Sequence, residues 1–334
     1  MNDVFILGAG FSKSIHNVMP TMNELSTEVL SDLEKLNLPV PPALYDLGNN
    51  IELWMTYLSQ RQPWLKNYNN DHNLSVAGHI RQLIKKSIDD RTSKAAESDT
   101  PGWLKNLIKS LHNQRATLIT LNYDTLIERA ARELQITDDI QRILAQQMYP
   151  PYFSNVASRS GVGLWGEDTI MTFSYLKLHG SVNWYYSGRS EFYGETIFFA
   201  DVPPLGTDNS SREKSLSMLS KDKEALIIPP VHEKTTYFNN ETIRGLWQDA
   251  GDALAKASRV FVIGYSLPIS DLGMQLFLIN NQPNQRTPVY VVDIDPEVAQ
   301  RYEEWLPKLN INKDFAHEQN PVAEFAEHYP SLDL

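Results

Sequence analysis

Short apolar runs recur along the chain between longer polar segments. Six of them are rich in β-forming residues and have turn residues at their ends: residues 4–7, 118–121, 175–178, 225–228, 260–263 and 289–292. Continuous apolar runs of this length are typical of parallel strands that are buried on both faces. The pattern therefore predicts six buried parallel strands.

Helical patterns lie between these runs. Thr21 and Glu24 form a capping box, and it opens a helix whose apolar face is expected to carry Leu25, Val29, Leu33 and Leu36. Thr100-Pro101 opens another helix, and residues 125–134, 241–257 and 271–281 are also expected to be helical. Strands that alternate with helices predict an α/β fold, a Rossmann-like doubly wound parallel sheet.

The spacing of the elements is uneven. About 110 residues separate the first predicted strand from the second, and helical patterns cover roughly 45–60, 75–89 and 103–113. We expect a single domain over residues 1–334, with a helical insertion module at about 40–115. Loop-rich excursions at about 141–172 and 187–223 are expected to form lids or partner contacts.

Composition narrows the function classes. The chain has 334 residues, and its 30 basic and 41 acidic side chains give a net charge of −11, so we expect no direct nucleic-acid binding. The absence of cysteine excludes disulfides, cysteine-based zinc sites and cysteine nucleophiles. No apolar run is long enough for a membrane span and no signal peptide is recognisable, so we expect a cytoplasmic protein.

Two glycine loops follow predicted strands, where ligands bind in open α/β sheets. They are Gly8-Ala9-Gly10-Phe11-Ser12 and Gly264-Tyr265-Ser266. We expect Gly8 and Gly10 to permit positive φ and to bring backbone amides close to an anion, with Ser12 adding a hydroxyl contact. A purely structural strand-to-helix turn explains one such loop equally well. Two loops at one sheet edge favour a ligand that contains pyrophosphate.

An acidic residue, Asp293, ends the last predicted strand. This is where a carboxylate can hold ribose hydroxyls in dinucleotide-binding folds. The alternative is a helix N-cap before Pro296, for which Asp295 is the better candidate.

Asn122, Asp124 and His179 carry the candidate chemistry. An amide can bind a sugar hydroxyl or orient a water, and His179 precedes Gly180, which opens space beside it. The structural alternatives are that Asp124 caps the next helix and that His179 is an ordinary core or solvated histidine. The histidines lack a close H-x-x-x-H or H-E-x-x-H arrangement, so we expect no metal.

In their order along the chain, these motifs resemble those of the sirtuins. The matching pieces are residues 8–12, Leu121-Asn122-Tyr123-Asp124, Lys177-Leu178-His179-Gly180 and Gly264-Tyr265-Ser266-Leu267. The resemblance spans residues 4 to 295. It implies a Rossmann-like fold that binds NAD+ and cleaves it at the nicotinamide–ribose bond.

Two departures refine the resemblance. The four-cysteine zinc ribbon of sirtuin deacylases cannot exist here, and Met19-Pro20-Thr21-Met22 stands near the position of their Asp-Phe-Arg triplet. The chain is therefore more similar to the bacterial sirtuin-like NADases of anti-phage defence. That resemblance implies NAD+ depletion in abortive infection, a homo-oligomer, and a separate partner chain such as a HerA-type ATPase or a short Argonaute.

The site that follows from the motifs and the resemblance has three parts. Asn122 binds the nicotinamide ribose and orients water, His179 acts as general base, and Asp124 supports the pocket or positions Asn122. Asp293 takes the adenosine ribose. The remaining cofactor-binding residues are Gly8, Ala9, Gly10, Phe11, Ser12, Thr21, Gly264 and Ser266. The alternatives are an NAD-dependent deacylase or ADP-ribosyltransferase, and a non-catalytic nucleotide-binding assembly subunit.

Overall fold

The protein is built around a six-stranded parallel sheet with the strand order β3-β2-β1-β7-β8-β9. The computed structural model describes residues 2–136, 148–149, 172–186, 197–200, 202–203, 210–219, 223–229 and 240–332. The strands are β1 (Asp3–Leu7), β2 (Thr117–Thr120), β3 (Ser174–Lys177), β7 (Arg259–Ile263), β8 (Pro288–Val292) and β9 (Asn310–Asn312). The order reverses between β1 and β7, as in dinucleotide-binding folds, so the predicted Rossmann-like fold is confirmed.

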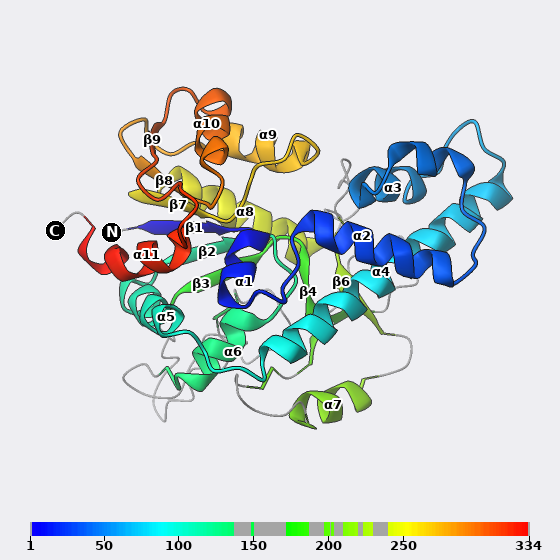
Figure 1. Cartoon of the computed structure of the whole chain (residues 1–334), viewed down its shortest axis with the longest axis horizontal. Coiled ribbons are helices and arrows are strands. Elements are labelled where there is room, and N and C mark those ends of the chain that lie inside the picture. Colours follow the sequence, from blue (N-terminus) through cyan, green and yellow to red (C-terminus); the bar gives the residue numbers. More distant parts are fainter. Residues whose placement is uncertain are drawn as a thin grey trace.

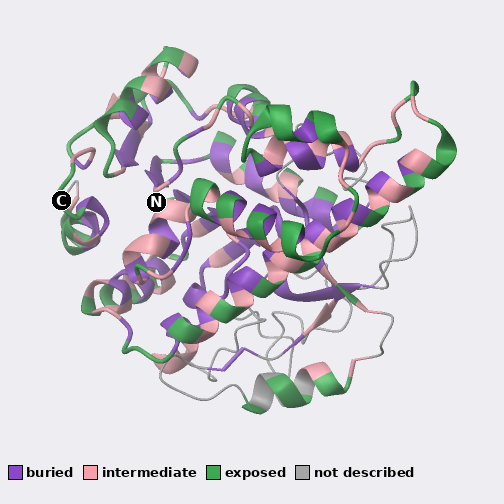
Figure 2. Ribbon diagram, turned by 45° about the vertical axis from the view of Figure 1, so that its right-hand side comes forward, coloured by how far each residue is buried: buried purple, intermediate pink, exposed green. Residues whose placement is uncertain are grey.

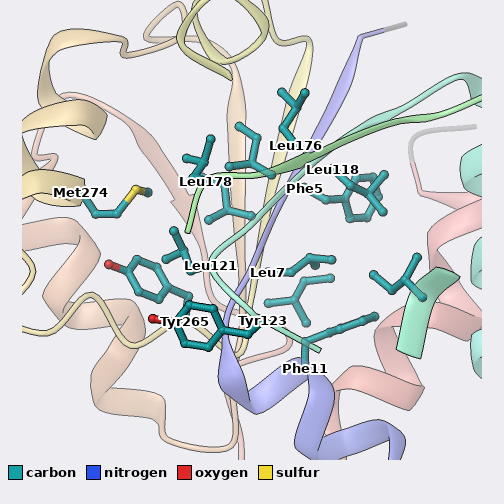
Figure 3. Close-up of a cluster of buried hydrophobic side chains, with 14 of the residues drawn as sticks. Phe5, Leu7, Phe11, Leu118, Leu121, Tyr123, Leu176, Leu178, Tyr265 and Met274 are labelled. Carbon is teal, nitrogen blue, oxygen red and sulfur yellow. The ribbon is translucent and has the colours of Figure 1, made fainter. Parts of the chain in front are cut away.

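The core lies on both faces of this sheet. All five residues of β1 are buried, and Phe5 stacks on Phe261 of β7 with ring centroids 4.7 Å apart. Figure 3 shows Phe5, Leu118 and Leu176, from three adjacent strands, packed in one cluster. A strand that is buried on both faces can be apolar along its whole length, which is why β1 lacks alternation.

Helices cover both faces of the sheet. In Figure 1, α1, α5, α6 and α11 lie on one side of it, and α8, α9 and α10 lie on the other. Their bounds are α1 (Ala9–Ile15), α5 (Gly102–Gln114), α6 (Leu126–Glu133), α8 (Glu241–Ala255), α9 (Leu272–Asn280), α10 (Pro296–Trp305) and α11 (Pro321–His328), which is followed by η4 (Tyr329–Ser331). Figure 2 shows their buried faces turned inward and their exposed faces outward. None of the helices in the described ranges is long and apolar enough to cross a membrane.

A group of helices extends away from the sheet (Figure 1). It contains α2 (Met22–Lys35), η1 (Pro42–Leu47), α3 (Ile51–Leu58) and α4 (Asn67–Ala95), and α4 packs on both α2 and α3. By contrast, α5 packs on α6 and α11 and so covers the sheet.

The capping box that opens α2 is confirmed. The Thr21 side chain accepts a hydrogen bond from the backbone N–H of Glu24, whose carboxylate accepts one from the N–H of Thr21. Leu25, Val29 and Leu33 are buried as predicted. Leu36 is not part of that face, because it is the C-cap residue and its side chain turns outward, 47% exposed.

A second, antiparallel sheet branches from the end of β3. Its order is β5-β4-β6, formed by β4 (Gly180–Tyr186), β5 (Phe198–Phe199) and β6 (Glu224–Ile227). The prediction that residues 225–228 form a parallel strand is therefore wrong, since β6 pairs with β4. The cause is Gly180, whose φ of +80° turns the chain out of the main sheet directly after His179. The predicted excursions at 141–172 and 187–223 lie largely outside the described residues, although the second contains β5 and α7 (Ser210–Ser217).

Candidate active site

A cavity of about 990 Å³ opens where the sheet order reverses. Four of its lining residues directly follow four different strands of the main sheet: Gly8, Leu121, Gly264 and Asp293. A fifth, His179, is the second residue after β3. Residues of α2 and α3, among them Ser26 and Glu52, close it from the opposite side. The volume is at the upper end of the range of ligand pockets, so the cavity can hold a ligand of dinucleotide size.

Most of the residues selected from the sequence meet in this cavity. Those that line it are Gly8, Ala9, Gly10, Thr21, Asn122, His179, Gly264, Ser266 and Asp293. Phe11, Ser12 and Asp124 do not line it, because their side chains are buried behind its wall. The Phe11 ring packs edge-on against Trp103, with centroids 6.0 Å apart, which is a core contact.

The two glycine loops pack tightly against each other. The expected positive φ is wrong for Gly8 and Gly10: Gly8 is extended and Gly10 lies in α1, whereas Gly264 has a φ of +61°. The N–H of Gly8 donates to Ile263 O at 3.0 Å and that of Gly10 to Gly264 O at 2.9 Å. These two amides therefore serve the fold and are not offered to an anion.

Steric contact explains why these positions are glycine. A Cβ at Gly8 would lie 2.4 Å from Gly264 O, and one at Gly264 would lie 2.3 Å from the backbone nitrogen of Phe11. The close approach of backbone to backbone requires glycine on both loops. The loops that follow β1 and β7 are therefore in direct backbone contact at the floor of the cavity.

A chain of hydrogen bonds that runs from the cavity into the core fixes Asn122. Its Nδ2 donates to Gly8 O and to Ser12 Oγ, both at 2.8 Å, and Ser12 Oγ donates to Asp124 Oδ2 at 2.6 Å. The other oxygen of Asp124 accepts from the backbone N–H of Leu126 at 3.1 Å. The N-cap position of α6 is Thr125, so Asp124 is not the cap itself, although it accepts from the first residue of that helix. Asp124 also orders the side chains behind the cavity wall.

The direction of these bonds determines what Asn122 can offer. A carbonyl oxygen such as Gly8 O only accepts, and the hydroxyl proton of Ser12 is used on Asp124. The NH₂ end of the Asn122 side chain must therefore point toward Gly8 O and Ser12 Oγ. This leaves Oδ1, a hydrogen-bond acceptor, as the polar atom that Asn122 can present to a ligand.

His179 lies where the two sheets meet. Its side chain is buried, and its ring lies between those of Tyr123 and Trp247, with centroid separations of 6.4 and 6.3 Å. Its backbone carbonyl accepts from the N–H of Ile228 at 2.9 Å, and Trp247 Nε1 donates to Leu178 O at 3.2 Å. Backbone and ring packing together hold the imidazole at the cavity wall.

An ion pair lies at the rim of the cavity, where Lys13 lines it and Glu24 is its partner. Lys13 Nζ lies 2.6 Å from each carboxylate oxygen of Glu24, and this ion pair with the N–H of Thr21 lowers the pKa of Glu24 to about 2. Among the described residues that line the cavity, Lys13 is the single cation. Lys13 was not among the residues selected from the sequence, although its position one turn into α1 was a usable signal.

The far end of the cavity is acidic. Burial raises the pKa of Asp293, whose Oδ1 accepts from the N–H of Asp295 at 3.0 Å. Asp295 itself caps α10 by accepting from Glu297 N, which confirms its assignment as the cap. Arg301 donates to Ser266 O, so the Gly264 loop is tied to α10 beside Asp293.

Fold and cavity together define an α/β protein with a nucleotide-type site at the switch point of a parallel sheet. The family model of the SIR2-like domain matches residues 116–312, more than half of the chain. The chain belongs to the SIR2-like family, and this membership implies the use of NAD+. The matched range contains Asn122, His179 and Asp293 but begins after the first glycine loop.

One solved structure also matches over most of the chain, at low similarity. A crystal structure of Sir2 in complex with the inhibitor EX-527, 2'-O-acetyl-ADP-ribose and deacetylated p53 peptide matches with 16% sequence identity and a TM-score of 0.41. The match covers 99% of this chain and 93% of that chain. No curated protein has a significant match to this sequence.

In the described part of the chain, no group of three or more histidine, aspartate or glutamate residues could hold a metal ion.

Proposed function

We propose that the protein hydrolyses NAD+ at the nicotinamide–ribose bond, releasing nicotinamide and ADP-ribose. One observation carries the proposal: Asn122 and His179, on turns that follow two neighbouring strands, line the same cavity at the switch point of a SIR2-like fold. The chemistry requires a site that holds the ribose and places a water beside it. An amide acceptor and an imidazole in a largely apolar wall suit that task.

The residues divide the reaction between them. Nicotinamide leaves as a neutral group, because the electron pair of the broken C1′–N bond neutralises its ring nitrogen, so no strong acid is needed. Asn122 Oδ1 accepts from the attacking water or from a ribose hydroxyl. As water forms the new C1′–O bond, His179 takes its proton, directly or through a ribose hydroxyl.

The rest of the cavity suits the remainder of the dinucleotide. Lys13 is the cation available to the diphosphate, and Asp293 lies at the end of β8, where a carboxylate can bind the adenosine ribose. Gly264 and Ser266 form the wall between these ends. The glycine loops then only shape the cavity wall, because the amides of Gly8 and Gly10 are bonded within the fold. Side chains and other backbone amides bind the phosphates.

We further propose a defence role for this activity. The absence of cysteine removes the zinc ribbon of the deacylases, which leaves the resemblance to the bacterial sirtuin-like NADases of anti-phage defence. A separate partner chain, such as a HerA-type ATPase or a short Argonaute, would then supply the sensor. Assembly of several copies would let that partner control the depletion of NAD+.

The test is incubation of the purified full-length chain with NAD+, followed by separation of the products. We expect equal amounts of nicotinamide and ADP-ribose without any acylated peptide. Turnover only with an acylated peptide indicates a deacylase, and modified protein in place of free ADP-ribose indicates a transferase. No turnover, even with co-purified partner chains and extracts of infected cells, refutes the proposal and favours an assembly subunit.

A further inference from the structure

A fully buried ion pair lies behind the cavity wall. Lys177, the last residue of β3, has its Nζ 3.0 Å from Glu128 Oε1, and both side chains are 0% exposed. Tyr149 donates its hydroxyl proton to the same Glu128 oxygen at 2.6 Å. A buried ion pair contributes little net stability compared with apolar residues of similar size. Its presence in the core therefore calls for a reason other than stability.

The ammonium group of Lys177 also reaches the turn that carries Asn122. Lys177 Nζ donates to the backbone carbonyl of Asp124, the residue whose carboxylate holds Ser12 and, through it, Asn122. One lysine thus joins the end of β3 to the turn after β2. The carboxylate of Glu128, in the first turn of α6, fixes the lysine in that direction.

The same segment holds the turn at a second point. The carbonyl of Tyr123 accepts from the backbone N–H of Val182 at 3.0 Å and from Ser181 Oγ at 3.2 Å. Three residues of this segment, Lys177, Ser181 and Val182, therefore donate to two consecutive backbone carbonyls, those of Tyr123 and Asp124. The segment that carries His179 is therefore hydrogen-bonded to the turn that carries Asn122, and these bonds fix the two residues relative to each other.

We propose that Lys177 is a positioning residue: its bond to the Asp124 carbonyl sets the Asn122 side chain relative to His179, and Glu128 orients the lysine. This inference rests on the proposed hydrolysis of NAD+. Lys177 does not line the cavity, so its loss is expected to lower kcat with little change in KM. A displacement of about 1 Å between reacting groups can lower the rate by about 100-fold.

Two variants separate positioning from stability. Glu128→Gln keeps an oxygen acceptor, so Lys177 can still donate to Asp124, but the buried ammonium loses its counter-ion and this variant is expected to be the less stable of the two. The double variant Lys177→Met/Glu128→Gln removes that donor without leaving an unpaired buried charge. We expect kcat of the double variant to fall at least about tenfold below that of Glu128→Gln, with KM for NAD+ within about twofold.

A second readout does not depend on activity. Hydrogen–deuterium exchange of the peptide that covers residues 122–126 is expected to be faster in the double variant than in Glu128→Gln, with α4 peptides unchanged. Equal kcat and equal exchange in the two variants overturn the inference. If the wild-type chain releases no nicotinamide, the proposed function has failed, and the exchange result alone decides whether Lys177 holds the turn.

If the double variant does not fold, Lys177→Arg is the substitute: retained kcat supports the inference, and a loss of kcat with unchanged exchange overturns it.

Discussion

The two sides of the cavity are built on different principles. On the side of Asn122, the polar groups that support the wall are buried and bonded in one direction, from Asn122 through Ser12 to Asp124. On the rim, Lys13 and Glu24 form an ion pair whose side chains are 33% and 50% exposed. Buried, directed bonds fix geometry, whereas exposed ion pairs contribute little to stability and can exchange partners. We infer that the residues on the Asn122 side determine kcat and that the residues on the rim determine the affinity for NAD+.

The largest expected effect comes from the atoms nearest the reaction. Asn122→Ala and His179→Ala should each lower kcat for nicotinamide release by about 100-fold or more, since in the proposed mechanism each removes a group that acts in the transition state. Circular dichroism should show an unchanged fold. His79→Ala, on α4 and outside the cavity lining, is the matched control and should keep full activity. Near-normal activity of both site variants contradicts the assignment.

The next effect tests whether the buried bonds act on rate. Ser12→Ala removes the acceptor of Asn122 and the donor to Asp124, so we expect kcat to fall about tenfold and stability to drop by about 1–3 kcal/mol. Ser87→Ala, at a buried serine of α4, should leave kcat unchanged. Initial rates and urea unfolding measure the two effects. If Ser12→Ala changes KM but not kcat, the division between the two sides of the cavity is wrong.

The acidic end should affect binding more than rate. Asp293→Ala removes a carboxylate that we expect to hold ribose hydroxyls, so KM for NAD+ should rise about tenfold while kcat stays within about twofold. The control is Asp295→Asn, which preserves the cap of α10 two residues away. An equal fall of kcat in Asp293→Ala would place this residue with the reacting groups.

The smallest effect concerns the rim and depends on pH. The pKa of Glu24 is lowered to about 2 in the folded protein, so its ion pair stabilises the fold above its ordinary pKa and loses that effect as pH falls toward about 2. Because both side chains are substantially exposed, we expect Glu24→Gln to cost less than about 1 kcal/mol at pH 7. Urea unfolding between about pH 6 and 3 should show the difference shrinking with falling pH and with added salt. A difference that is constant over this range contradicts the assignment of the ion pair.

Much of the sheet could be predicted from the sequence, and the reasons differ by strand. β1, β7 and β8 each contain a continuous apolar run of at least four residues, and that pattern is specific when both faces are buried. β6 has the same pattern but pairs in the small antiparallel sheet, because periodicity reports burial and not the partner strand. β9, with the sequence Asn-Ile-Asn, is too short and too polar to give a signal.

The site was predictable to the extent that topology determines it. Polar residues that follow parallel strands meet at one edge, which is why Asn122, His179 and Asp293 line one cavity. The use of the Gly8 and Gly10 amides was not predictable, since it depends on contact with a loop about 250 residues away. The bond from Lys177 to Asp124 depends on the same kind of tertiary contact.

The most direct test of the central claim is NAD+ turnover by the full-length chain in water labelled with heavy oxygen. The account predicts one nicotinamide for each ADP-ribose, heavy oxygen on the anomeric carbon of the ribose that carried nicotinamide, and loss of both products in Asn122→Ala. ADP-ribose transferred to a protein or to an acyl group, or turnover that persists unchanged in Asn122→Ala, would contradict it.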